Sequence, residues 1–339
     1  MSKHLFTTFV FTPAGASDAA LAIAASRAGA VGVVNAEFQS DSQTVLAMLA
    51  SVARFASQGY GLKLDRLDLT LETALRSPAL SGLTWLIVEP AVLETGWDLL
   101  VQLRERGVRI LVEVCAPVVP ALPTEGVVEG WLLKGNEAGG FVGEDASFIL
   151  IQKWLKLSTL PLYLRGGVTP HVAAACHAIG MAGVVLDSQV LLLEDAGPSD
   201  ALVALLGNLS GNEAQAIGDG EHGEYVRVLV RPGHNAARQL AVEGEGAGFE
   251  RLKGLVQGKI DWVNLRAGLL PLGQDVCFAG AWRKQYRRLG EVLKVIDAAV
   301  ADHLSAAVGS QALVKSSPLA EALGIPYPLV QGPMTRVSD

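Results

Sequence analysis

The feature that most constrains this chain is a regular alternation between two kinds of segment. Short apolar runs rich in β-branched residues alternate with longer Ala- and Leu-rich segments of helical period. This alternation is typical of βα units, in which a helix follows each parallel strand. Eight such strands within about 190 residues predict a (β/α)8 TIM barrel of the α/β class, with a doubly wound open sheet as the alternative. We expect the strands at residues 5–11, 30–35, 59–64, 83–88, 108–114, 128–133, 161–164 and 183–186.

Helix signals lie between these strands. Ser17-Asp18 predicts an N-cap for a helix over 17–28, and Thr169-Pro170 predicts the start of a helix over 169–179. After residue 195 the pattern changes, and we interpret residues 195–310 as a C-terminal helical elaboration packed on the barrel, so that the domain spans 1–310. Within it we expect helices at 201–209, 251–259 and 283–308, and one extra strand at 225–230.

Composition excludes several classes of protein. The 339 residues are 50% hydrophobic and only 18% charged, which favours a large core with both faces of a sheet covered. A net charge of −7 without a basic run argues against a nucleic-acid partner, and no run reaches the length of a membrane span. Cys115, Cys176 and Cys277 are far apart and odd in number. This indicates a reducing, cytoplasmic setting rather than disulfides or a thiolate zinc site.

Ionisable residues stand at the ends of almost all the expected strands. Barrel enzymes build their sites at the carboxyl ends of the strands, so these side chains should meet at one rim. Each of them alone is equally explained by a solvated loop. Together, in a chain poor in charge, they predict a charged mouth made of Glu37, Lys63, Glu89, Glu113, Lys134, Arg165 and Asp187.

Two glycine-rich turns follow the sixth and seventh strands. Gly166-Gly167 precedes a helix, where backbone N–H groups and the helix start favour an anion. Barrels commonly bind a phosphate in the loops after strands seven and eight, and Asp187-Ser188 follows the eighth strand. The other turn surrounds Glu137 and is long enough to wrap a ligand. The alternative for Gly166-Gly167 is a tight turn without a ligand, and the alternative for the turn around Glu137 is an ordinary exposed loop.

These motifs carry a resemblance to a known family. Gly135-Asn136-Glu137-Ala138-Gly139-Gly140, Arg165-Gly166-Gly167 and Pro271-Leu272-Gly273-Gln274-Asp275 resemble segments of the nitronate monooxygenase (2-nitropropane dioxygenase) family of FMN-dependent barrels. The resemblance covers most of residues 5–195. It implies FMN in the mouth, with the phosphate near Ser188, the ring near Gly139, and a lysine stabilising the reduced ring. The implied cofactor-binding residues are Lys63, Lys134, Gly139, Gly140, Arg165, Gly166, Gly167, Asp187 and Ser188.

The chain departs from the family at its catalytic position. Phe141 stands where the family has a His, and an apolar ring cannot accept a proton from a nitroalkane carbon. Lys134 and Glu137 are then the catalytic candidates, and hydride transfer to or from an acyl-type substrate is the expected chemistry.

A second departure concerns the phosphate. Asp187-Ser188 replaces a Gly-Thr pair, and a carboxylate beside a phosphate is repulsive unless Arg165 neutralises it. We expect FMN to be accepted if Arg165 pairs with Asp187. If Arg165 pairs instead with Glu137 or Glu113, we expect FMN to be excluded.

The C-terminal segment predicts a second copy. Residues 324–334 look like an apolar strand running into a turn, and residues 337–339 look like a helix start, a pattern that repeats the beginning of the chain. Val330-Gln331-Gly332-Pro333-Met334 also resembles the family's first strand. We therefore interpret 311–339 as a linker and the truncated start of a second barrel. Tandem copies of this kind resemble those of very large polyketide or polyunsaturated fatty-acid synthase-like proteins, in which a related barrel is an enoyl reductase, so other synthase domains are the expected partners.

Three functions remain open at this point. The first is an FMN-dependent oxidoreductase. The second is a degenerate barrel that acts as a docking or structural module, with ion pairs filling the space of a cofactor. The third is a divalent-metal site on Glu37, Glu89, Glu113 and Asp187 with Lys134 as base, which ranks last because interleaved cations would repel the metal. The histidines have no ligand spacing, so no metal is expected.

Overall fold

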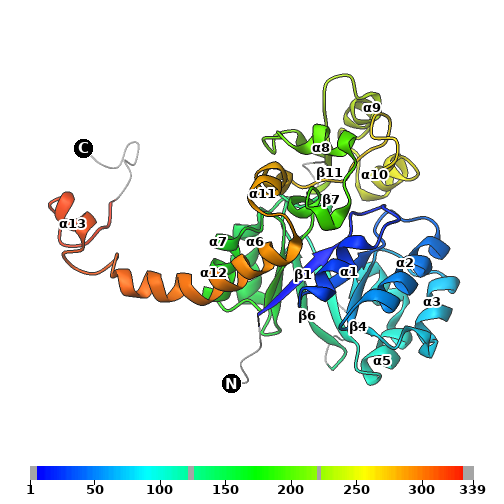
Figure 1. Ribbon diagram of the computed structural model, residues 1–339, viewed down its shortest axis with the longest axis horizontal. Helices are drawn as coiled ribbons and strands as arrows, with labels where there is room; N and C mark the ends of the chain where they lie inside the picture. The colour runs from blue at the N-terminus through cyan, green and yellow to red at the C-terminus, as the bar shows by residue number, and fades with distance from the viewer. Residues whose placement is uncertain (1–5, 121–125, 220–222, 331–339) are drawn as a thin grey trace.

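The computed structural model describes residues 6–120, 126–219 and 223–330. At its centre eight parallel strands close into a barrel in the order β1-β2-β3-β4-β5-β6-β8-β9, and β9 pairs with β1 (Figure 1). This confirms the predicted fold class, and the closure excludes the open sheet. The barrel strands are β1 (Thr7–Phe11), β2 (Val31–Asn35), β3 (Tyr60–Leu64), β4 (Leu83–Val88), β5 (Arg109–Val114), β6 (Val128–Lys134), β8 (Leu162–Arg165) and β9 (Gly183–Leu186).

Helices cover the outside of the barrel. Their apolar faces form one large core with the outward-facing residues of the strands. Between β5 and β6, the described residues 115–120 and 126–127 form no helix. The covering helices are α1 (Ala20–Arg27), α2 (Ser42–Phe55), α3 (Leu69–Arg76), η1 (Pro78–Leu80), α4 (Pro90–Thr95), α5 (Trp97–Glu105), α6 (Ser147–Leu157), α7 (Pro170–Ala178) and α12 (Leu289–Ser310).

The inside of the barrel has an apolar layer below a charged one. Because side chains alternate along a strand, the residue two positions after an inward-facing one also faces inward. Glu113, Lys134 and Arg165 follow the inward-facing apolar layer in this way, at the carboxyl ends of β5, β6 and β8. The charged side chains are therefore held on an apolar floor made of Phe9, Phe11, Val33, Trp85, Ile87, Leu111, Leu132, Tyr163 and Val185.

Two helix predictions need correction. Helix α1 begins at Ala20 rather than at 17, and its N-cap is Ala19; the Asp18 carboxylate still accepts from the Ala20 N–H at 2.5 Å. The predicted helix over 283–308 is two helices, α11 (Ala279–Gln285) and α12, separated by the non-helical residues 286–288; there Arg287 pairs with Glu194 at 2.8 Å and the Leu289 N–H donates to Asp195 at 2.7 Å. Thr169 is the N-cap of α7, as predicted.

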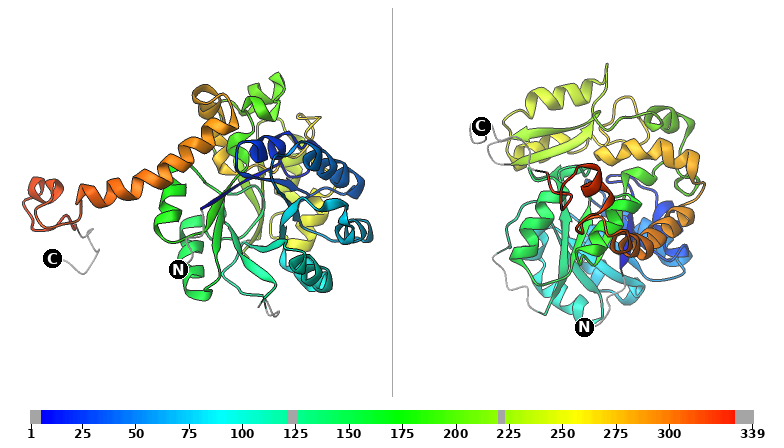
Figure 2. Two further views of the ribbon diagram at one scale, coloured as in Figure 1. Left: turned by 60° about the horizontal axis from the view of Figure 1, so that its bottom comes forward. Right: turned by 90° about the vertical axis from the view of Figure 1, so that its left-hand side faces the viewer.

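The elaboration between β9 and α12 is a cap over the carboxyl ends of the strands (Figure 2). The predicted strand at 225–230 is confirmed as β11, but the elaboration is not only helical. Strand β11 pairs with β10 on one side and with β7, from the loop after β6, on the other. The further elements are η2 (Ser188–Val190), η3 (Glu194–Ala196), α8 (Asp200–Leu206), β7 (Gly140–Val142), β10 (Ala214–Asp219), β11 (Glu224–Leu229), α9 (Asn235–Glu243), α10 (Phe249–Val256) and η4 (Gln274–Phe278).

The C-terminal segment projects from the barrel as an arm. The first half of α12 packs against α7, whereas its second half and α13 (Pro318–Ala322) lie away from the barrel (Figures 1 and 2). Of the predicted strand at 324–334, residues 324–330 form bends and no strand. Residues 331–334 and the helix start at 337–339 lie outside the described residues. None of the described helices is long and apolar enough to cross a membrane.

Candidate functional site at the mouth of the barrel

The predicted charged residues meet at one rim and pair with one another. Lys63 lies at the centre, and its Nζ atom is 2.8 Å from Glu37, 3.0 Å from Glu113 and 3.2 Å from Glu89. The side chains of Lys63 and Glu37 are completely buried. Each of these four side chains comes from a different strand end, so closure of the barrel assembles a cluster that no local segment contains.

Arg165 links Asp187 to the carboxylates that surround Lys63. Its Nε atom donates to Asp187 at 2.9 Å, while its Nη1 atom donates to Glu113 at 3.0 Å and to Glu37 at 3.3 Å. The two pairings that we treated as alternatives therefore occur together. Lys134 donates to Glu37 at 3.0 Å and completes the set. We call these seven residues the ion-pair cluster: Glu37, Lys63, Glu89, Glu113, Lys134, Arg165 and Asp187.

The cluster keeps Glu113 and Glu37 charged although they are buried. Burial opposes ionisation of Glu113, but Lys63, Arg165 and Lys134 lower its pKa to about 2. Burial likewise opposes ionisation of Glu37, and the same three cations hold its pKa well below the ordinary value. Removing charges from water is costly, so such a cluster is stable only when each charge has partners in good geometry.

The predicted phosphate turn already holds a carboxylate of the protein. Gly167 has φ +67°, and its N–H donates to the Asp275 side chain at 3.3 Å. The Gly273 N–H donates to the Ser188 hydroxyl at 3.0 Å. Burial, and then the nearby charge of Asp187, raise the pKa of Asp275 well above its ordinary value. The donors expected to bind an anion therefore contact the segment Pro271–Asp275 from the elaboration.

The same segment closes the place expected for the flavin ring. A Cβ atom at Gly139 would lie 2.4 Å from the Pro271 carbonyl oxygen and 2.8 Å from the Gly273 nitrogen. The cavity between Asn35, Arg165 and Leu272 measures only about 10 Å³. Pockets for ligands of drug size measure about 300–1,000 Å³. In this conformation the residues that the sequence assigns to FMN lie together but do not fit it.

Phe141 and Glu137, which the sequence analysis singled out after the sixth strand, are both held by contacts with other residues of the protein. Phe141, at the position of the family's His, contacts Phe38 and Phe249 with ring centroids 5.2 and 4.8 Å away. It belongs to the core of the small sheet. Glu137 accepts from the N–H and the hydroxyl of Ser147 at 3.0 and 2.9 Å, at the start of α6. Its carboxylate is thus engaged by the protein.

A cavity of about 430 Å³ opens on the other half of the mouth, along β3, β4, β5 and β6 and under α10. Lys134, Phe141 and Cys115 line it. Burial raises the pKa of the Cys115 thiol to about 11, so it is protonated at neutral pH and is a poor nucleophile.

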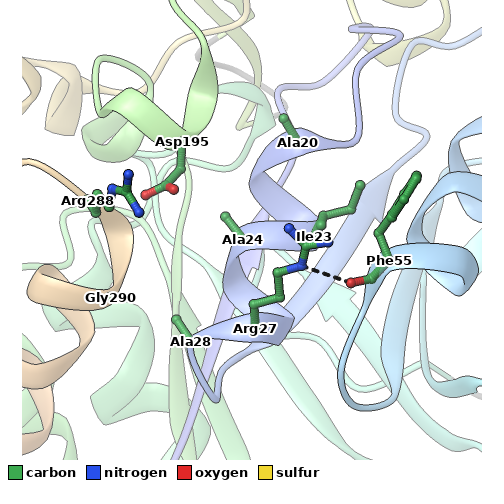
Figure 3. Close-up of a pocket in the computed structure, with 9 residues that line it drawn as sticks. All are labelled: Ala20, Ile23, Ala24, Arg27, Ala28, Phe55, Asp195, Arg288 and Gly290. Carbon is green, nitrogen blue, oxygen red and sulfur yellow. Dashed lines mark hydrogen bonds between the residues drawn. The ribbon is translucent and has the colours of Figure 1, made fainter.

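Another groove, of about 610 Å³, lies on the outside of the barrel between α1 and the start of α12 (Figure 3). Ala20, Ala24 and Ala28 form one wall, and Arg27 donates to the Phe55 carbonyl oxygen at 3.0 Å (Figure 3). This groove holds none of the residues that the sequence assigned to the site. Within the part of the chain that the structure describes, no three His, Cys, Asp or Glu side chains are grouped as metal ligands would be.

The fold has known relatives, although no protein-family model and no curated protein matches the chain. FabK from Thermotoga maritima superposes with a TM-score of 0.71 at 16% identity, over 88% of this chain and 94% of FabK. Nitroalkane oxidase from Streptomyces ansochromogenes gives 0.64 at 16%, over 88% and 97%. The enoyl reductase domain of MlnA from Bacillus amyloliquefaciens gives 0.63 at 12%, over 89% and 96%. The chain shares their fold.

Asp275 is the residue of this site that sequence reasoning missed. We noted the segment 271–275 only for its resemblance to the family. A signal was present, because Asp275 is a carboxylate that follows the apolar run Leu269-Leu270-Pro271-Leu272 after only two residues, and a carboxylate next to such a run is buried only with a partner. Nothing in the spacing indicated that the partner would be Gly167, 108 residues earlier in the chain.

Proposed function

We propose that this chain is a non-catalytic barrel that acts as a docking or structural module of a larger polyketide or fatty-acid synthase-like polypeptide in the cytoplasm. The observation that carries the proposal is the filled mouth. The ion-pair cluster and the segment Pro271–Asp275 occupy the place where the family resemblance puts FMN. An ion-pair cluster in place of a cofactor is the feature that we expected of a degenerate barrel.

Electrostatics support this proposal. A phosphate near Ser188 would lie beside Asp187 and Asp275, and Arg165 already shares its charge among three carboxylates. Asp187 is buried, and two unit charges about 4 Å apart repel by roughly 4 kcal/mol at the effective dielectric constant of about 20 that describes protein sites. That repulsion, together with the hydrogen bonds that Asp275 and Ser188 would lose, opposes binding of FMN at this turn.

Exposed apolar side chains support a docking role. Phe148 and Leu155 on α6 are 75% and 46% exposed, and Val118, in the loop that faces α6, is 67% exposed. The Trp154 indole donates to the Ala116 carbonyl oxygen at 3.1 Å, which holds this loop against α6. Exposed apolar side chains on two segments that contact each other are typical of a contact surface.

A second candidate function is an FMN-dependent oxidoreductase of the nitronate monooxygenase or enoyl reductase type. The 430 Å³ cavity beside Lys134 favours it, because an acyl-type substrate needs such a space. So do the names of two structures with the same fold, a nitroalkane oxidase and an enoyl reductase domain. This function requires the segment Pro271–Asp275 to leave Gly167 and Ser188.

A flavin titration decides between the two. FMN is added to the purified chain and to the variants Asp187→Gly and Asp275→Gly, and quenching of flavin fluorescence is followed. Riboflavin, which lacks the phosphate, is the matched ligand control, and circular dichroism verifies folding. We expect no binding by the unmodified chain.

The outcomes of the titration distinguish the docking role from the oxidoreductase. Binding by a variant alone, of FMN but not riboflavin, would support a barrel that lost its cofactor through that carboxylate. Failure of all three proteins would also support the docking role. A yellow purified protein, or tight FMN binding by the unmodified chain, would overturn the proposal in favour of the oxidoreductase.

A further inference from the structure

The 430 Å³ cavity lies apart from the turn expected to hold the FMN phosphate, and much of its lining is apolar. It lies along β3 to β6, whereas the donors expected for the FMN phosphate follow β8 and β9, in the other half of the closed barrel. Apolar side chains make up much of its wall, among them Val114, Ala116, Phe141 and Phe249. The cavity is therefore large enough and apolar enough to hold the body of a small organic molecule.

Carboxylates dominate the polar part of the lining. Asp65, Glu89, Glu94, Glu113 and Glu250 line the cavity against two ammonium groups, those of Lys134 and Lys253. Lys134 is committed to Glu37 at 3.0 Å, and Lys63 pairs with Glu113 and Glu89, so Lys253 is the one cation left among the described lining residues for Asp65, Glu94 and Glu250. An anionic ligand would meet unfavourable charge here.

Two of these carboxylates have unused capacity. Asp65 accepts from the Phe38 N–H through Oδ2 at 3.1 Å, while its buried Oδ1 atom has no hydrogen-bond partner among the described residues. Glu89 uses Oε1 for Lys63 at 3.2 Å, and its side chain is 19% exposed. The Oδ1 atom of Asp65 has almost no accessible surface, so a ligand would contact Asp65 through its other oxygen. The Oε2 atom of Glu89 accepts no hydrogen bond from the described residues, so a donor from a ligand in the cavity would be stabilised there.

We propose that this cavity binds small amphipathic amines, with the ammonium group on Asp65 and Glu89 and the apolar part against Val114, Ala116 and Phe141. Glu89 shares the charge of Lys63 with Glu37 and Glu113, and Asp65 has no ion pair among the described residues. An ammonium group would supply further donors and a positive charge to both. Burial is the main cause that raises the pKa of both Asp65 and Glu89, and a bound cation would lower it again.

The inference does not depend on the proposed function. The cavity and the donors expected for the FMN phosphate lie on different strands, so the amine and the phosphate group can each bind or fail to bind without the other. The two experiments are therefore distinguishable.

The test compares three ligands of similar shape on the full chain by isothermal titration calorimetry. Phenethylamine is the probe, 2-phenylethanol is its neutral counterpart, and 3-phenylpropionate is an anionic one. We expect the amine to bind about ten-fold more tightly than the alcohol or better, since a charge-assisted hydrogen bond replaces a neutral one, and the anion to show no binding.

Variants locate the site. Glu89→Gln should weaken amine binding about ten-fold while leaving the alcohol unchanged. Ala91→Phe, at an exposed lining residue, should block both ligands without changing any charge. Glu105→Gln, at an exposed position on α5, makes the same charge change outside the cavity and should have no effect. Equal affinity for amine and alcohol, or amine binding that survives both cavity variants, would overturn the inference.

Discussion

Replacing Lys63 by methionine is the sharpest test of the ion-pair cluster. Methionine keeps the unbranched shape of the lysine stem and removes the charge. In the variant, Glu37, Glu113 and Glu89 lose a cation that lies 2.8 to 3.2 Å from each of them. Lys134 and Arg165 remain, but they already serve Glu37 and Glu113. The three carboxylates must then take up protons, admit water or stay under-compensated.

The expected loss is large for a single substitution. Removing one partner from a buried ion pair costs about 3–5 kcal/mol, because the remaining charge stays buried. The free energy of unfolding of a domain is about 5–15 kcal/mol, so the variant would lose about a fifth of it or more. With an unfolding entropy of about 2.1 cal/mol/K per residue, a barrel of about 300 residues would lose about 5–8 °C in Tm.

The assay is thermal and urea unfolding followed by circular dichroism. The matched control is Lys153→Met, which removes the same charge from an ion pair with Asp145 at 2.7 Å whose lysine side chain is 48% exposed. Such a pair contributes about 0–1 kcal/mol. Equal small losses in both variants would refute the reasoning, because they would mean that water reaches Lys63.

The pH dependence is a second measure of the same cluster. The pKa of Glu113 is lowered to about 2 in the folded chain. Its contribution to stability is therefore present above the ordinary glutamate pKa, near 4.5, and is lost as the pH falls toward 2. The difference in stability between the unmodified chain and Lys63→Met should shrink over that range.

Two further predictions concern the segment that closes the mouth. Burial and then the charge of Asp187 raise the pKa of Asp275, so its contribution to stability is present at low pH and lost as the pH rises through the folded value. Asp275→Asn cannot ionise, and its Tm relative to the unmodified chain should increase from pH 4 to pH 8; a constant difference would contradict this. Gly139→Ala should lower the free energy of unfolding by about 1–3 kcal/mol, because its Cβ atom would meet the Pro271 carbonyl oxygen at 2.4 Å. Gly254→Ala, in an exposed position of α10 with open space around it, should raise that free energy by about 0.5–1 kcal/mol, and similar effects of the two would contradict the close approach.

The barrel could be predicted from the sequence because its signals are local. Each strand is an apolar run of four to seven residues, and each observed boundary among the described residues lies within about two residues of the expected one. The positions of Glu113, Lys134 and Arg165 at the carboxyl ends of their strands follow from the same runs. The missed break at residues 286–288 lies where the chain contacts Glu194 and Asp195, which are far earlier in the sequence, so no local pattern indicated it.

The sequence by itself thus determined the strands, their parallel order and the set of ionisable residues at the mouth. Only the tertiary structure decided which of those residues pair with one another and which segment covers them. Arg165 reaches Asp187 and Glu113 at the same time because closure brings β5, β8 and β9 around one centre. Asp275 takes the Gly167 N–H because the elaboration folds back over the mouth. Periodicity reports which face of a segment is apolar, whereas the pairing of charges depends on distances between segments that are far apart in the chain.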